Sequence, residues 1–181
     1  MGEARPHRVF FALWPDAAAA SRLSVLAQQL AGAGGRAMQP ATLHMTLAFV
    51  GAVTSAQIEA LRELAATVHG ETFDLSLDHL GFFPRGGIAW AGCRQMPSRQ
   101  RRLSEQLCDA LRGAGFAIDP RAGQVPHVTL ARRVQSPSLP PLETPIGWRA
   151  SEFALVESHL HPSAASYRTV ARFSLAEARA D

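Results

Sequence analysis

Two short stretches of the sequence carry the same pattern, His-x-Thr-Leu-Ala, once at His44 and once at His127. Histidine is the side chain whose unperturbed pKa, about 6.5, lets it accept or donate a proton near neutral pH. Threonine hydroxyls can donate hydrogen bonds to oxygen atoms on which negative charge develops. Two imidazoles on either side of one phosphate could therefore catalyse in-line displacement at phosphorus, one activating water and the other protonating the leaving oxygen.

Both copies lie in short apolar stretches, LHMTLAF and VPHVTLARR, that predict β-strands. Successive side chains of a strand alternate between its faces, so His44 and Thr46 share one face, as do His127 and Thr129. The apolar residues between them are expected to face the core: Leu43, Met45, Leu47, Val128 and Leu130. Threonine is a poor metal ligand and neither motif holds a carboxylate, so we expect no metal and no cofactor.

Each motif ends the same succession of elements. An apolar strand (8–13) precedes a helix that Asp16 can cap and that runs to about Ala31, then a glycine-rich turn and the first motif. A second strand (88–93) precedes a helix that opens at Ser98, a turn with two glycines and the second motif. This duplication predicts an α+β fold of two similar lobes, with antiparallel sheets and flanking helices around a central cleft on a pseudo-twofold axis.

The remaining segments predict further elements of the same fold. Thr54 and Gln57 have the spacing of a capping box at the start of another helix. The alternating stretch 73–80 predicts a half-buried strand, and residues 81–87 predict a turn. The proline-rich segment 135–145 is expected to be an exposed connector, followed by a closing hairpin of EFALVESHL and YRTVARFSL.

Length and composition predict one globular domain, spanning residues 1–181, built from two intertwined lobes. Hydrophobic residues make up 47% and charged residues 18%, which excludes a disordered chain. Two cysteines without a CxxC motif exclude a disulfide framework or a structural zinc site and favour the cytoplasm. No apolar run approaches the roughly 18 residues of a membrane span. We therefore expect a cytoplasmic monomer with no membrane partner.

With both motifs in a duplicated chain of this length, the sequence resembles the two-histidine (2H) phosphoesterase superfamily. Within it, the chain is most similar to the RNA 2′,3′-cyclic phosphodiesterases, which are 2′-5′ RNA ligase-like proteins. The similarity extends over nearly the whole chain, through RVFFAL, LHMTLAFVG, IAWAGC, PHVTLARR and LVESHL…YRTVARFSL.

The resemblance implies hydrolysis of a 2′,3′-cyclic phosphate, on an RNA end or a nucleotide, to a 2′-phosphomonoester without a metal. By this analogy His44 is the proton donor to the leaving 3′ oxygen, and His127 is the proton acceptor that activates water. Thr46 and Thr129 correspond to the family's phosphate-binding hydroxyls. The residues alone do not show which histidine is the proton donor and which is the acceptor, because the two roles could be exchanged in a pseudo-symmetric site.

Two adjacent arginines are candidates for a phosphate contact. The family's pattern favours Arg132, whereas strict strand alternation favours Arg133, which shares its face with His127 and Thr129. A β-bulge or a strand end would turn Arg132 toward the site. We expect Arg132 to make the bidentate phosphate contact.

Other functions compete with this hypothesis. Within the superfamily, the substrate could be a small cyclic nucleotide, or a 2′-5′ linkage in a ligase-like reaction. Outside it, an RNA-binding module could capture phosphate without turnover. Paired histidines argue against simple binding, because arginine or lysine would serve that purpose equally well.

The remaining histidines and aromatic residues are expected to be structural. His159 and His161 could bind a metal in principle, but an exposed pair is expected. Surface or capping positions are expected for three histidines: His7, His69 and His79. Some aromatic residues near the motifs could stack on a base, although core packing is expected. These residues are Phe10, Phe11 and Phe49, with Trp90 and Trp148 also assigned to the core.

Overall fold

The computed structural model describes residues 6–118, 125–135, 138–160 and 165–178. Its strands are β1 (His7–Leu13), β2 (Arg36–Ala37), β3 (Met45–Val53), β4 (Phe73–Leu77), β5 (His79–Phe83), β6 (Ile88–Gly92), β7 (His127–Arg132), β8 (Ile146–Ala150), β9 (Glu152–Leu160) and β10 (Ala165–Ser174). Its helices are α1 (Ala17–Ala31), α2 (Ser55–Ala66) and α3 (Ser98–Gly113), with a 3-10 turn, η1 (Pro40–Thr42).

The main sheet has the strand order β10-β9-β1-β3-β7-β6-β5, and β2 also pairs with β7. All of its strand pairs are antiparallel. The strands β9-β1-β3 of lobe one correspond to β5-β6-β7 of lobe two, and β10 extends lobe one beyond β9. The two lobes meet at the pair Met45–Val128. The predicted α+β fold of two similar lobes is therefore confirmed.

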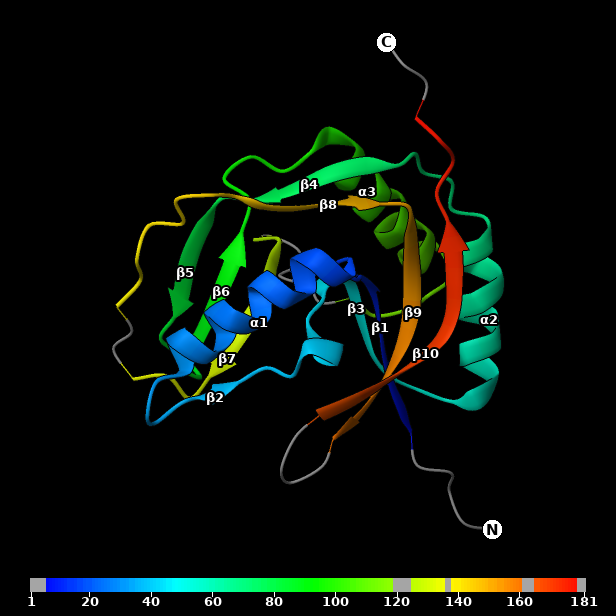
Figure 1. Cartoon of the computed structure of the whole chain (residues 1–181). Helices are drawn as coiled ribbons and strands as arrows, with labels where there is room; N and C mark the ends of the chain where they lie inside the picture. The colour runs from blue at the N-terminus through cyan, green and yellow to red at the C-terminus, as the bar shows by residue number, and fades with distance from the viewer. Residues whose placement is uncertain (1–5, 119–124, 136–137, 161–164, 179–181) are drawn as a thin grey trace.

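The helices cross between the lobes. Helix α1 follows β1 of lobe one but packs against β7 of lobe two, whereas α3 follows β6 of lobe two and packs against β3 of lobe one. Helix α2 packs beside α3 and β10, as Figure 1 shows. Both motif strands are thus supported from behind by a helix from the opposite half of the duplication.

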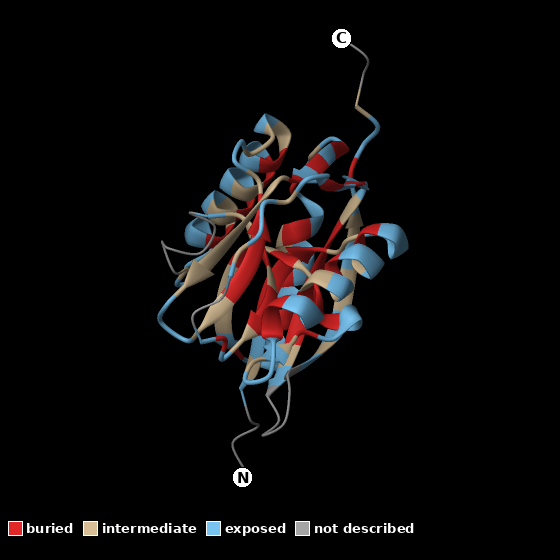
Figure 2. Ribbon diagram, turned by 60° about the vertical axis from the view of Figure 1, so that its left-hand side comes forward, coloured by how far each residue is buried: buried red, intermediate tan, exposed pale blue. Residues whose placement is uncertain are grey.

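Local sequence explains where the helices begin and end. The Asp16 side chain accepts a hydrogen bond from the backbone N–H of Ala19, and the helix ends at Gly32, whose φ of 54° suits glycine. Thr54 and Gln57 form the predicted capping box of α2. In α3 the predicted apolar stripe is buried: Leu103, Leu107 and Leu111. Figure 2 shows buried residues along the strands and inner helix faces, with exposed residues outside.

The prediction for residues 73–87 was partly wrong. The chain leaves β4 at Asp78 and enters a second strand, β5, that pairs with β6 instead of with β8. Gly81, expected in a turn, lies inside β5. The residue at this position is glycine because a Cβ there would be 2.1 Å from Cζ2 of Trp90. The glycine therefore marks the close approach of an indole ring and not a chain reversal.

The structure also contains a strand that the sequence pattern did not reveal. Residues of β8 follow the proline-rich connector directly and pair with β4 in a separate two-stranded sheet. The described part of the connector has neither helix nor strand, as predicted. The closing hairpin is confirmed by the pairing of β9 with β10.

Candidate active site

The two motifs lie side by side where the lobes meet. Met45 pairs with Val128 in an antiparallel ladder, and both are fully buried. His44 and Thr46 flank Met45, and His127 and Thr129 flank Val128, so all four residues lie next to the point where the two strands pair. We call the face that carries these four half-buried residues the motif face.

Each motif strand has a β-bulge at the same motif position. Between β1 and β3 the register passes from Thr46 to Ala48, and between β6 and β7 it passes from Thr129 to Ala131. The leucine of each motif is the extra residue, so leucine and the following alanine are both buried. The residue after that alanine consequently turns back to the motif face.

The bulge in β7 determines which of the two arginines shares the face of His127. It places Arg132, half-buried at the end of β7, on the same face as His127. The positive charge of Arg132 acts on both His44 and His127. Arg133 lies beyond the strand with a φ of 57° and is exposed. The bulge thus places Arg132 on the face of His127, where uninterrupted alternation would have placed Arg133.

Both imidazoles are oriented by the same local hydrogen bond. Nδ1 of His44 lies 2.7 Å from the carbonyl oxygen of Thr42, and Nδ1 of His127 lies 2.6 Å from that of Val125. A carbonyl only accepts hydrogen bonds, so each Nδ1 carries the proton and donates it. In the neutral ring, Nε2 then keeps its lone pair, which can accept a proton from a ligand.

Aromatic rings surround His44. Its ring centroid lies 4.9 Å from that of Phe10, 5.3 Å from that of Trp14 and 5.0 Å from that of Tyr167. Phe10 is buried, as predicted, but it also contacts the imidazole directly. The sequence reasoning missed Trp14 and Tyr167. Trp14 could have been found, because it shares its face of the first strand with Phe10.

A second aromatic set surrounds His127. Its ring centroid lies 5.2 Å from that of Phe83 and 5.7 Å from that of Trp90. Trp90 is buried, as predicted, and contacts His79 as well, at 5.2 Å between ring centroids. The prediction that His79 is an isolated surface residue was therefore wrong: it is half-buried and its Nδ1 also contacts Asp78.

The aromatic surroundings lower the pKa of both imidazoles. Burial is the main cause of the lowered pKa of His44, about 4, and the positive charges of Arg132 and protonated His127 lower it further. Burial also lowers the pKa of His127, again assisted by Arg132. The hydrogen bonds to Thr42 and Val125 oppose these shifts only in part. Both rings are therefore neutral in the free protein at pH 7.

The threonine hydroxyls are available to a ligand. Within the described part of the chain, neither Thr46 nor Thr129 makes a side-chain hydrogen bond. In those same residues, no group of three or more His, Cys, Asp or Glu side chains is arranged to hold a metal ion. None of the described helices is both long enough and apolar enough to cross a membrane.

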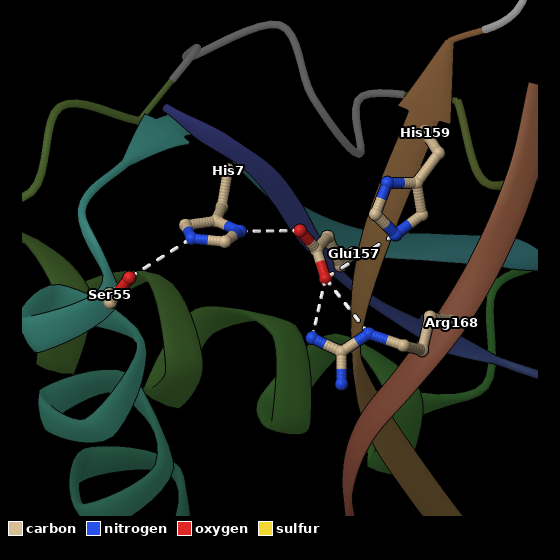
Figure 3. A network of polar contacts seen from close by, with 5 residues as sticks. All are labelled: His7, Ser55, Glu157, His159 and Arg168. Atoms are coloured by element: carbon tan, nitrogen blue, oxygen red, sulfur yellow. Dashed lines mark hydrogen bonds and ion pairs between the residues drawn. The ribbon is translucent and has the colours of Figure 1, made fainter. Parts of the chain in front are cut away.

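His7 belongs to a separate polar network, shown in Figure 3. The buried carboxylate of Glu157 lies 2.5 Å from Nδ1 of His7 and accepts two hydrogen bonds from Arg168, while Nε2 of His7 contacts Ser55. His159 lies 3.4 Å from the same carboxylate. The prediction that His7 is an isolated surface residue was therefore wrong, because it links β1 to β9 and α2.

Three further histidines were expected at exposed positions: His69, His159 and His161. His69 is exposed, as predicted, and so is His159. His161 lies outside the described residues. Among the remaining aromatic residues, Phe11 and Trp148 are buried, as predicted, whereas Phe49 is only half-buried.

Comparisons with known proteins agree with this geometry. A family model described as the 2′-5′ RNA ligase superfamily matches residues 13–162. The chain is 30% identical over 176 residues to the RNA 2′,3′-cyclic phosphodiesterase of Escherichia coli strain K12, covering 95% of this chain and 98% of that protein. It is 28% identical over 116 residues to the protein of the same name from Archaeoglobus fulgidus, covering 62% and 65%.

Solved structures share the fold over almost the whole chain. The crystal structure of Escherichia coli LigT complexed with 3′-AMP has a TM-score of 0.85 at 29% identity, covering 94% of this chain and 98% of that one. The crystal structure of TT0787 of Thermus thermophilus has a TM-score of 0.80 at 25% identity, covering 95% and 100%. The duplicated motifs, the shared fold and the family match together show that the chain belongs to the 2′-5′ RNA ligase superfamily of two-histidine phosphoesterases.

Proposed function

We propose that this protein hydrolyses the 2′,3′-cyclic phosphate of RNA ends to a 2′-phosphomonoester, without a metal ion, by paired-histidine general acid–base catalysis. The observation that carries the proposal is the motif-face quartet, in which two imidazoles that both donate through Nδ1 and two threonine hydroxyls flank the Met45–Val128 pair joining the motif strands. The names of the relatives from Escherichia coli and Archaeoglobus fulgidus support this choice of substrate.

Each residue of the site has a role in this reaction. Nε2 of His127 takes a proton from water, whose oxygen attacks phosphorus opposite the 3′ oxygen. The bond from phosphorus to the 3′ oxygen breaks, and His44 donates a proton to that oxygen, which leaves a 2′-phosphate and a 3′-hydroxyl. Thr46 and Thr129 donate hydrogen bonds to the non-bridging oxygens, and Arg132 neutralises their charge.

The low pKa of His44 requires that the ring take up a proton from solvent when the substrate binds. At a pKa of about 4 the ring is neutral in the free protein, so it cannot act as an acid before the phosphate binds. A bound phosphate monoanion beside His44 favours the protonated form and opposes the effect of Arg132. Burial also lowers the pKa of His127, which suits this residue as the base because its ring remains unprotonated near neutral pH.

Hydrolysis in the presence of a chelator tests the proposed function. The purified protein should convert adenosine 2′,3′-cyclic phosphate, or an RNA oligonucleotide with the same terminus, at an unchanged rate after dialysis against EDTA. The product should co-elute with adenosine 2′-monophosphate and not with the 3′-isomer. Loss of activity with EDTA, restored by a divalent metal, would refute metal-independent catalysis. Retention of RNA without turnover of either substrate would instead support a binding module.

A further inference from the structure

The duplicated site differs between the lobes at one position. The residue after the bulge is Arg132 in lobe two and Phe49 in lobe one. The guanidinium carbon of Arg8 lies 4.8 Å from the centroid of the Phe49 ring, within the range of a cation–π interaction. Lobe one therefore also presents a guanidinium at this place, supplied by a neighbouring strand and supported by an aromatic ring.

Arg8 lies close to the candidate catalytic residues. It shares a face of β1 with Phe10, two residues further along the strand, and Phe10 contacts both His44 and Tyr167. Two residues of a strand span about 7 Å. The Arg8 side chain therefore starts one such step along β1 from Phe10, whose ring contacts His44.

Two arginines of this region carry positive charge without a matching carboxylate. Among the described residues, no carboxylate forms an ion pair with Arg8 or Arg132. Arg36 lies directly opposite Arg132 in the β2–β7 ladder, which adds a third guanidinium to the region. Burial raises the pKa of the Tyr167 phenol, but the charges of Arg132, Arg8 and Arg36 oppose the rise, so all three act on this phenol.

We propose that Arg8, stacked on Phe49 beside Tyr167, forms a second anion subsite that binds the phosphodiester on the 5′ side of the terminal nucleoside. The subsite rests on the proposed function, because it would bind the phosphodiester next to the cyclic phosphate that His44 and His127 hydrolyse. It makes the protein favour RNA ends over mononucleosides. A single-stranded backbone has this chemistry: a monoanionic phosphate at a fixed spacing from the terminal one.

Two substrates that differ by one nucleotide test the subsite. Adenosine 2′,3′-cyclic phosphate has only the scissile phosphate, whereas adenylyl-(3′→5′)-adenosine 2′,3′-cyclic phosphate adds one phosphodiester. In Arg8→Gln, kcat/KM for the dinucleotide should fall by about tenfold, while that for the mononucleoside should stay within about twofold of wild type. The dependence of log(kcat/KM) on log salt for the dinucleotide should become shallower by about 0.7.

Controls separate this subsite from a general charge effect. Arg62→Gln removes the same charge from the exposed side of α2, where Arg62 pairs with Glu59, and should leave both substrates unaffected. Arg8→Lys should keep the salt dependence but recover only part of the lost kcat/KM. Equal losses on both substrates, or no loss in Arg8→Gln, would refute the subsite. Failure of the wild-type protein to hydrolyse either substrate would instead refute the proposed function.

Discussion

Replacing His44 or His127 with alanine should lower kcat for cyclic phosphate hydrolysis by about 10²–10⁴-fold, since each change removes one partner of the proposed acid–base pair. The double variant should be little worse than either single variant, because the proposed mechanism uses both imidazoles in one concerted displacement. Steady-state rates with adenosine 2′,3′-cyclic phosphate measure both effects. Loss of the ring should leave KM within a few-fold of wild type, because Thr46, Thr129 and Arg132 still hold the phosphate.

His69→Ala is the matched control for these two variants. His69 is exposed and distant in sequence from both motifs, so its loss should leave kcat unchanged. Circular dichroism should show that all variants are folded at the assay temperature. A folded His44→Ala or His127→Ala variant that retains more than about one-tenth of the wild-type kcat would contradict the acid–base roles.

Arg132→Gln should lower kcat/KM by about 10²-fold, the typical cost of removing a group that neutralises developing charge. The same change should alter the pH profile, because the charge of Arg132 lowers the pKa of both imidazoles. The productive complex needs one proton on the pair of imidazoles, and the pKa values of both imidazoles in the free protein lie below 6.5. Wild-type log(kcat/KM) should therefore fall above pH about 6.5. Removing a positive charge raises both pKa values, so this falling limb should shift to higher pH.

Two neighbouring substitutions make the Arg132 result specific. Arg132→Lys keeps the charge but loses the bidentate geometry, so its pH profile should match wild type while kcat/KM remains reduced. Arg133→Gln removes a charge from the exposed neighbour and should change neither quantity. Two results together would contradict the choice of Arg132 as the phosphate contact. Arg133→Gln would lower kcat/KM as much as Arg132→Gln does, and the pH profile of Arg132→Gln would match that of the wild type.

Strand alternation predicted the site only as far as the bulges. It correctly placed Met45 and Val128 in the core, with the histidines and threonines on the other face. It failed at Arg132, because the extra residue at Leu130 changes which face the following side chains occupy. A bulge depends on pairing with a neighbouring strand, so the motif's own residues do not reveal it.

The aromatic surroundings of the imidazoles could be predicted only in part. Trp14 follows the first strand closely and shares its face with Phe10, but Tyr167 comes from β10 at the other end of the chain. Its contact with His44 depends on the strand order β10-β9-β1-β3, which brings non-local segments together. Gly81 suggested a turn because the Trp90 ring that leaves no room for a Cβ at this position belongs to the partner strand β6, which the local sequence does not show.

A crystal structure with adenosine 2′-monophosphate bound tests the central claim most directly. The 2′-phosphate should lie between the two rings, with a phosphate oxygen about 2.6–3.2 Å from Nε2 of His127 and the 3′-hydroxyl at the same range from Nε2 of His44. The hydroxyls of Thr46 and Thr129 should contact other phosphate oxygens. A bound product that reaches only one of the two imidazoles, or that binds away from the motif face, would contradict paired-histidine catalysis in this protein.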